Sequence, residues 1–214
     1  MIRKRGRPIY VSGCSALNDK RTQTMDRGVA SPHPGLRAPR TLAYILISQL
    51  GWLVLVMGAA RGWGIVGIVY VACASGWHLH GASQPRREAL LIVLVGATGW
   101  LWDSLIAHTG LLRYPNGILI AGTAPYWIAG LWALFAIQLN TLFKWLQGRP
   151  LLAAAIGAVA GPASFRAGAA LHAVSFVHPV EATIFLAFGW AIWLPAALAL
   201  AASLGEARRS SAIE

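Results

Sequence analysis

The sequence predicts an all-α protein: a polytopic bundle of six transmembrane helices with both termini in the cytoplasm. Three observations carry this prediction, namely the composition, six apolar segments of suitable length, and the distribution of basic residues. Of the 214 residues, 57% are hydrophobic and 12% are charged, whereas soluble domains carry about 25% charged residues. Ten tryptophans and 23 glycines also fit a membrane protein, because tryptophan gathers at membrane interfaces and glycine is frequent in spanning helices.

Residues 1–40 form a basic arm ahead of the first apolar segment. They contain nine of the 18 Lys and Arg residues and lack the apolar centre of a signal peptide. We expect this arm to be disordered and cytoplasmic, and Met25 is an alternative start site that would shorten it. The net charge of +11 does not indicate nucleic-acid binding, because the basic residues lie in the arm and in short loops and not on one folded face.

Six apolar segments follow the arm, and each approaches the length of about 20 residues that crosses a bilayer. They comprise residues 41–60, 62–79, 88–108, 125–146, 151–171 and 180–204. We therefore predict a membrane domain over 41–204 and a cytoplasmic tail over 205–214. Pro150 favours a helix start at the fifth segment. Residues 109–124 are apolar but interrupted by a Pro-Asn-Gly turn at Pro115, which predicts an interfacial or shallow re-entrant loop.

Six spans would place both termini on one side of the membrane, and the basic residues indicate which side. Fifteen of the 18 Lys and Arg residues fall on the side of the termini, while Arg61, Arg113 and Arg166 fall on or towards the other side. Because cytoplasmic loops carry the excess of Lys and Arg, this distribution predicts that both termini are cytoplasmic.

Asp103 is a carboxylate inside the third apolar segment, and an ionisable side chain in a membrane span is costly and usually functional. Arg166 in the fifth segment has a similar predicted depth, since it lies 16 residues beyond Pro150 while Asp103 lies 15 beyond Glu88. We therefore expect the two side chains to pair. Such a pair would either fix the bundle or act in catalysis or binding. Alternatively, Arg166 extends to the outer surface without touching Asp103.

Three further polar residues of the apolar segments are candidates for a role inside the membrane: Gln49, Ser104 and Asn140. Gln49 and Asn140 are expected to form hydrogen bonds between helices. Ser104 directly follows Asp103, so the two side chains point about 100° apart on a helix. That angle is a poor geometry for a nucleophile and its base.

His108 and His172 fall at the predicted outer face and are candidates for a metal or haem site. Neither belongs to a spaced motif such as HExxH, so no metal and no cofactor is predicted. The sequence also lacks a GxSxG elbow, a P-loop and a CxxC pair. Its two cysteines are too few for a disulfide framework.

Several short motifs are shared with a known family. They are Gln49–Trp52, Gly58–Ala60, Leu101–Ser104, Gly110–Pro115, Trp132–Ala136, Leu139–Asn140, Trp145–Pro150 and Gly161–Phe165. Through them, residues 42–202 resemble the bacterial inner-membrane family filed as domain of unknown function 2878. Phe165 stands where this family leads us to expect Tyr, and the basic arm lies outside the resemblance. The resemblance implies a polytopic inner-membrane protein and no established activity.

Three functions remain open from the sequence. The first is an accessory or structural membrane protein in a lipid- or envelope-related pathway, acting with an unidentified membrane partner protein. The second is a membrane-embedded enzyme or binder for a lipid-like substrate, with Asp103 as acid, base or cation-binding group and Arg166 as anion clamp. The third is a small transporter subunit. In each case the expected partner is the lipid bilayer and not nucleic acid.

Overall fold

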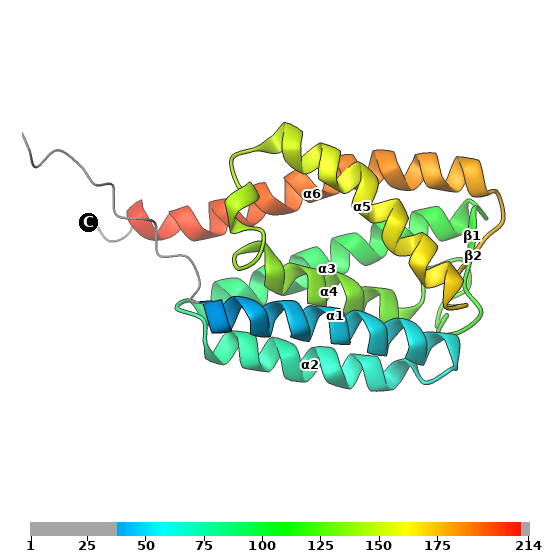
Figure 1. Cartoon of the computed structure of the whole chain (residues 1–214), viewed down its shortest axis with the longest axis horizontal. Helices are drawn as coiled ribbons and strands as arrows, with labels where there is room; N and C mark the ends of the chain where they lie inside the picture. Colours follow the sequence, from blue (N-terminus) through cyan, green and yellow to red (C-terminus); the bar gives the residue numbers. More distant parts are fainter. Residues whose placement is uncertain (1–37, 211–214) are drawn as a thin grey trace, which may run out of the picture. The chain divides into compact units, whose positions relative to one another are not determined.

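Six α-helices form most of residues 38–210, which are the residues that this computed structural model describes. They are α1 (Ala38–Ala60), α2 (Gly64–His80), α3 (Pro85–His108), α4 (Tyr126–Leu139), α5 (Pro150–Ala170) and α6 (Pro179–Ser210) (Figure 1). The short 3-10 helix η1 (Lys144–Leu146) precedes α5, and two short strands, β1 (Leu112–Arg113) and β2 (Ser175–Phe176), pair antiparallel. The all-α prediction is confirmed. Of the arm predicted over residues 1–40, residues 1–37 lie outside the described residues, and residues 38–40 form the start of α1.

Four of these helices are long and apolar enough to cross a membrane, namely α1, α3, α5 and the Pro179–Gly205 part of α6. The apolar helices α2 and α4 are shorter, with 17 and 14 residues. At 1.5 Å per residue they extend about 26 and about 21 Å, which is less than a hydrocarbon core of about 30 Å. The prediction of one helix over 125–146 is wrong, because the chain turns at Asn140 and the Phe143 amide bonds to the Gln138 carbonyl.

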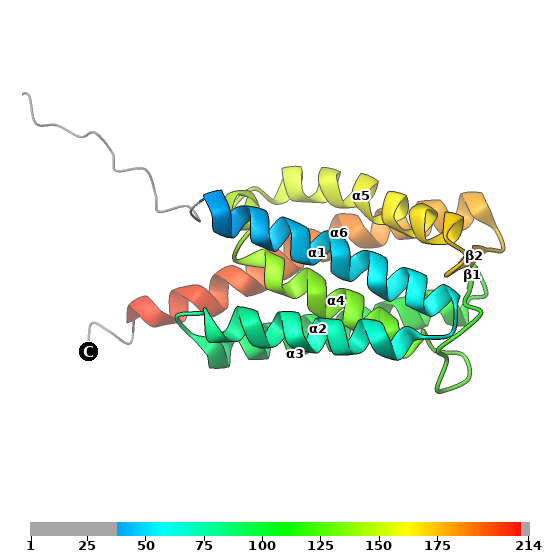
Figure 2. The same cartoon turned by 60° about the horizontal axis from the view of Figure 1, so that its bottom comes forward.

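The helices form three consecutive hairpins, α1–α2, α3–α4 and α5–α6, and α4 lies at the centre (Figures 1 and 2). It packs against α1, α2, α3 and α6, and 8 of its 14 residues are buried. In contrast, α5 packs mainly against α6. Its Gly157 and Gly161 face Trp190 of α6, so this GxxxG pattern serves packing within the chain.

The loops gather at two ends of the bundle. We call the end formed by residues 61–63, 109–125 and 171–178 the strand end, because it carries β1 and β2. The opposite end is formed by residues 81–84 and 140–149. At the strand end the backbone amide of Val177 donates to the carbonyl of Leu111, beside the β1–β2 pair. Leu112, Tyr114, Ala124 and Pro125 of the 109–125 loop are buried, whereas residues 118–122 at its tip are exposed.

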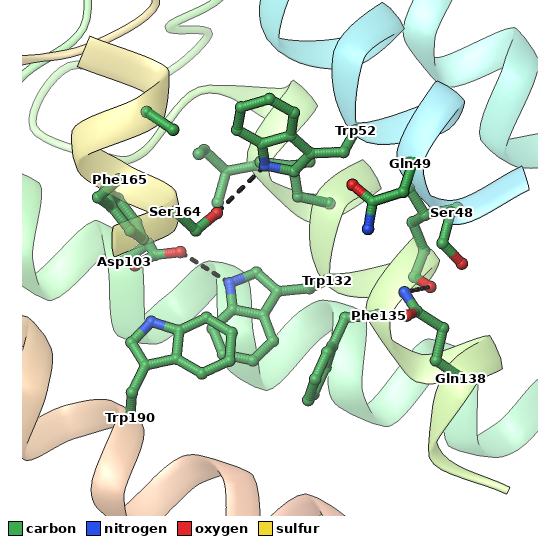
Figure 3. A pocket seen from close by; sticks show the side chains of 14 residues that line it. Ser48, Gln49, Trp52, Asp103, Trp132, Phe135, Gln138, Ser164, Phe165 and Trp190 are labelled. Atoms are coloured by element: carbon green, nitrogen blue, oxygen red, sulfur yellow. Dashed lines mark hydrogen bonds between the residues drawn. The ribbon is translucent and has the colours of Figure 1, made fainter. Parts of the chain in front are cut away.

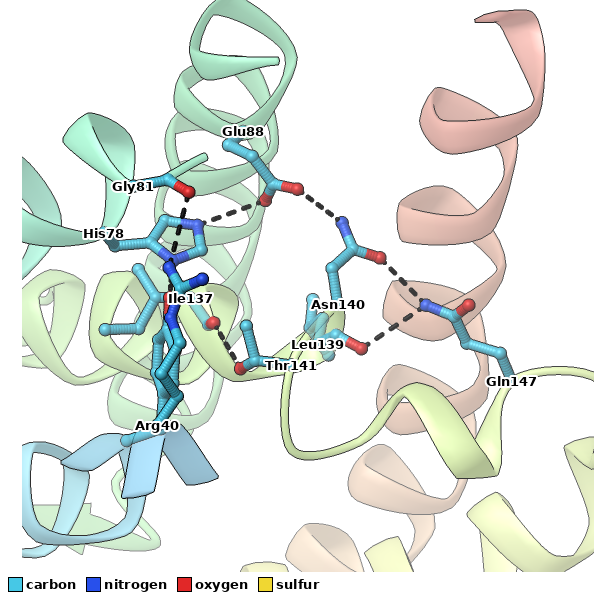
Figure 4. A network of polar contacts seen from close by, with 10 residues as sticks. Arg40, His78, Gly81, Glu88, Ile137, Leu139, Asn140, Thr141 and Gln147 are labelled. Atoms are coloured by element: carbon cyan, nitrogen blue, oxygen red, sulfur yellow. Dashed lines mark hydrogen bonds and ion pairs between the residues drawn. The ribbon is translucent and has the colours of Figure 1, made fainter. Parts of the chain in front are cut away.

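Five polar side chains connect α1, α2 and α3 to the segment that follows α4 at the opposite end, and Figure 4 shows four of them, His78, Glu88, Asn140 and Gln147. We call Tyr44, His78, Glu88, Asn140 and Gln147 the polar clamp. The Tyr44 hydroxyl lies 2.9 Å from Nδ1 of His78, whose Nε2 lies 3.3 Å from the Glu88 carboxylate. Asn140 donates to Glu88 at 3.0 Å and accepts from Gln147 at 2.9 Å. Asn140, which directly follows α4, thus links the end of that helix to α3, and His78, only 3% exposed, is part of the same network.

Candidate functional site in an aromatic cleft

A cleft of about 450 Å³ lies between α1 and α5, with α4 as its floor (Figure 3). Its aromatic lining residues are Trp52, Trp132, Phe135, Phe165 and Trp190, and its polar ones are Ser48, Gln49, Asp103, Gln138 and Ser164. The cleft exists because α5 packs on α6 and not on α1. One bridge crosses it, a 3.1 Å hydrogen bond from Nε1 of Trp52 on α1 to the Ser164 hydroxyl on α5.

Asp103 contributes a buried carboxyl group to the wall of this cleft, with 1% of the residue exposed. Its Oδ2 accepts a 2.7 Å hydrogen bond from Nε1 of Trp132 on α4. Its Oδ1 has no hydrogen-bond partner among the described residues. Gly99, one turn earlier on α3, makes this geometry accessible, because any Cβ there would overlap the Trp132 indole.

The Trp132 indole is held in place by a stack of aromatic rings. It lies nearly parallel to Trp190 of α6, with ring centroids 4.8 Å apart and an interplanar angle of 9°. Phe135 meets both rings edge-on. Trp190 in turn lies against Gly157 and Gly161, where a side chain would overlap it. The small residues of α5 therefore set the position of Trp190. Because Trp190 stacks on Trp132, they also help to orient the indole N–H of Trp132 that donates to Asp103.

Comparison with models of protein families gives a match that covers most of the chain. The profile of the family described as Protein of unknown function (DUF2878) matches residues 41–196. The chain belongs to this family. The match runs from α1 into α6 and contains every residue that lines the cleft. Comparison with curated proteins found no match, and comparison with solved structures found none either.

Within this DUF2878 chain, Asp103 and Arg166 do not pair, so the predicted ion pair is wrong. Arg166 is exposed, and its Nη2 donates a 3.0 Å hydrogen bond to the Thr183 hydroxyl on α6. Its guanidinium also lies over the ring of Phe176, 5.7 Å from the centroid. The prediction rested on height along the helices. It did not account for direction around the axis, and Asp103 points to α4 whereas Arg166 points to α6.

The other predicted residues of the DUF2878 chain separate into different places. The Ser104 hydroxyl donates to the Trp100 carbonyl at 2.8 Å and accepts from the Ala124 amide at 3.0 Å, so it ties α3 to the next loop. Gln49 lines the cleft, away from Asp103 and near Gln138 (Figure 3). His108 and His172 are both exposed. The residues described here include no group of three or more His, Cys, Asp or Glu side chains that could hold a metal.

Two residues of the site, Trp132 and Trp190, were missed from the sequence. Both stand in the middle of apolar segments, whereas tryptophans of spanning helices are enriched at the interfaces. A buried indole N–H usually needs an acceptor, and Asp103 is an acceptor in a neighbouring segment. That reasoning predicts a partner for Asp103, but it does not distinguish Trp132, which donates, from Trp190, whose Nε1 is unpaired among the described residues.

Proposed function

We propose that this protein binds an amphiphilic, lipid-like molecule in the aromatic cleft, with Asp103 holding a polar group of the ligand. The observation that carries the proposal is the unpaired, buried Oδ1 of Asp103 in the wall of an apolar cavity. A buried acceptor without a partner is destabilising, and an N–H or O–H of a ligand would satisfy it. The cleft volume of about 450 Å³ falls within the usual range for small-molecule sites.

Binding is favoured over catalysis by the chemistry of the lining residues. Apart from Asp103, the cleft is lined by apolar, hydroxyl and amide side chains, and no His, Cys, Lys or Arg is among them. General acid–base or nucleophilic catalysis normally requires a second reactive group within hydrogen-bond reach. The proposal therefore develops the binding form of the enzyme-or-binder hypothesis, and it is compatible with an accessory role in a lipid- or envelope-related pathway.

The proposed setting is a bacterial inner membrane, crossed by all six helices with both termini in the cytoplasm. Four helices of sufficient length and the excess of basic residues towards the termini support it. The shorter helix α4 is covered by its neighbours, so it needs less contact with lipid. Alkaline phosphatase inserted after Gly117 should be active, and the same enzyme fused to the C-terminus should be inactive. The reverse pattern would exclude this orientation.

The binding proposal can be tested with a brominated long-chain alcohol, which supplies an O–H donor and quenches nearby tryptophans. Trp52, Trp132 and Trp190 line the cleft, so the protein purified in non-ionic detergent should show saturable quenching. In Asp103→Asn the amide can still accept from Trp132, but it offers an N–H at the position of Oδ1. We expect this variant to keep its fold and to bind about tenfold more weakly, as for the loss of a hydrogen bond to a charged group.

The matched control is Glu181→Gln, which removes an exposed carboxylate outside the cleft. It should quench like the wild type. Quenching that rises without saturation in the wild type, or that is unchanged in Asp103→Asn, would refute the proposal.

A further inference from the structure

A second cavity, of about 630 Å³, lies at the strand end of the bundle. We call it the strand-end pocket. It is formed by β1 and the residues after it, by the last turns of α5, and by the segment that leads into α6. Its cationic and polar lining residues are Arg113, Tyr114, Arg166, His172 and Ser175. No Asp or Glu lines it, so its charge favours an anion.

Both guanidinium groups of the pocket are free to bind an anion. In the described part of the chain, neither Arg113 nor Arg166 forms an ion pair; the ion pair present there joins His78 and Glu88. Arg166 uses Nη2 to reach Thr183, which leaves its other N–H groups unused. A guanidinium presents five donors in a planar fork that matches the oxygens of phosphate or carboxylate.

Tyr114 lines both the strand-end pocket and a smaller cavity beside it, and its buried hydroxyl lies on the side of Asp103. It is 4% exposed, and its hydroxyl has no hydrogen-bond partner among the described residues. Burial raises the pKa of this phenol, and the nearby Asp103 carboxylate raises it further. The hydroxyl therefore remains protonated and able to donate, yet no acceptor in the described chain meets it. Such an unpaired buried donor is rare in folded proteins.

His172 occupies a strained position on the rim of the same pocket. Its φ of 63° makes it the only described non-glycine residue with a positive φ. The Ala173 amide donates to the Gly168 carbonyl at 3.0 Å, which closes the end of α5 around it. Glycine is the usual residue at such a helix end. A histidine there places an imidazole beside Arg113 and Arg166 in the pocket lining, and its positive φ strains the backbone.

The strand-end pocket adjoins the aromatic cleft. A small cavity of about 30 Å³ lies between them, and its lining includes Trp52 and Phe165 from the cleft together with Tyr114 and Val174 from the pocket. This cavity is about the size of one water molecule, so the two sites are neighbours and are not joined by an open channel. One side of the cationic pocket thus borders an apolar site, which is the arrangement that a lipid with an anionic headgroup requires.

We propose that the strand-end pocket binds the phosphate-type headgroup of the amphiphile whose apolar part occupies the cleft. The inference rests on the proposed function, and it adds the chemical class of the ligand and the residues that select it. Free phosphate shares this chemistry. The adjoining apolar cleft favours a lipid headgroup over the free ion.

The test compares three probes on the full chain in non-ionic detergent: hexadecyl phosphate, hexadecanol and inorganic phosphate. Displacement of the brominated alcohol reports on binding to the cleft. Hexadecyl phosphate gives up the hydrogen bond that hexadecanol donates to Asp103 but gains charge-assisted hydrogen bonds to the two guanidinium groups of Arg113 and Arg166, so it should bind about tenfold more tightly than hexadecanol. Arg113→Gln and Arg166→Gln should each reduce this preference and leave hexadecanol binding unchanged. Arg113 is the cleaner variant, because its guanidinium forms no hydrogen bond or ion pair within the described chain that a substitution would break.

Arg61→Gln is the matched control, since Arg61 lies at the same end of the bundle but outside the pocket. Equal effects of Arg61→Gln and Arg113→Gln would indicate general surface charge and overturn the inference. So would inorganic phosphate that competes as well as hexadecyl phosphate. Equal binding of hexadecyl phosphate and hexadecanol would overturn the headgroup site while the cleft proposal stands. Failure of both long-chain probes to bind would overturn the two proposals together.

Discussion

The indole of Trp132 on α4 donates a 2.7 Å hydrogen bond to Asp103 on α3, and this bond satisfies one of the two buried carboxyl oxygens. Replacing Trp132 with Phe keeps an aromatic ring but removes the donor. Because the other oxygen is already unpaired, we expect a loss of about 1–3 kcal/mol in the free energy of unfolding.

The control for this bond is a double-mutant cycle with Asp103→Leu, measured by denaturant unfolding in detergent. Without the carboxylate, Trp132→Phe should lower the free energy of unfolding by clearly less than it does in the wild type. Equal costs in the two backgrounds would mean that the indole stabilises the protein by stacking on Trp190 alone.

The contact between α5 and α6 depends on the absence of a side chain at Gly161. A Cβ at this position would overlap the Trp190 indole, so Gly161→Ala should lower the melting temperature and disturb the aromatic stack. Gly76→Ala on α2 is the comparison, because a Cβ added there would meet no other atom within 4 Å. There the substitution should stabilise the helix by about 0.5–1 kcal/mol. Thermal melts of both variants test this expectation. Similar changes in melting temperature for Gly161→Ala and Gly76→Ala would contradict this account of the interface.

The polar clamp should depend on Glu88, which accepts a hydrogen bond from Asn140 and lies beside His78. Glu88→Ala leaves these two groups without their acceptor in a region that is partly buried. We expect a loss of about 1–3 kcal/mol in unfolding free energy. Glu181→Ala, which removes an exposed carboxylate from the first turn of α6, should have a smaller effect. Comparable losses would show that the clamp contributes no more than a surface charge.

His172→Gly should stabilise the fold while it weakens anion binding. Glycine adopts the left-handed conformation of this position without the penalty of about 1–2 kcal/mol that other residues incur. His172→Ala removes the same imidazole but keeps the strain, so only the glycine variant should raise the melting temperature. Both variants should bind hexadecyl phosphate more weakly than the wild type does. Tight binding in either one would remove His172 from the anion site.

Helix positions could be predicted closely because they depend on local sequence. Long apolar runs and the proline at position 150 mark the helices, and α5 begins at Pro150 as expected. The end of α4 was missed because it depends on a tertiary contact: Asn140 leaves the helix and bonds to Glu88 on α3. The β1–β2 pair was missed as well, since strands of two residues carry no periodicity.

The candidate site could be predicted only in part, for a geometric reason. The cost of a buried charge identifies Asp103, and the structure places this residue in the cleft wall. Its partner depends on how α3 is rotated about its own axis. That rotation is set by Gly99 and Trp132 packing together, which is a contact between helices and not a pattern within one of them. Arg166 lines a different cavity from Asp103, the strand-end pocket. We propose that it binds an anion there.

The aromatic cleft lies on a seam. On one side are α1 to α4, and on the other is the α5–α6 hairpin. The hairpin meets the other helices through the packing of α6 on α3, where Trp102 stacks on Phe185, through the Trp132–Trp190 stack, and through the β1–β2 pair. The size of the ligand site therefore depends on how the α5–α6 hairpin packs on the other helices, and no single helix determines it. An acyl chain that enters the cleft from the bilayer would push the α5–α6 hairpin away from α1. The hairpin would then tilt about its attachment at the strand end. A cross-link between α1 and α5, near the Trp52–Ser164 bridge, would then lock the site without altering any group that contacts the ligand's polar atoms.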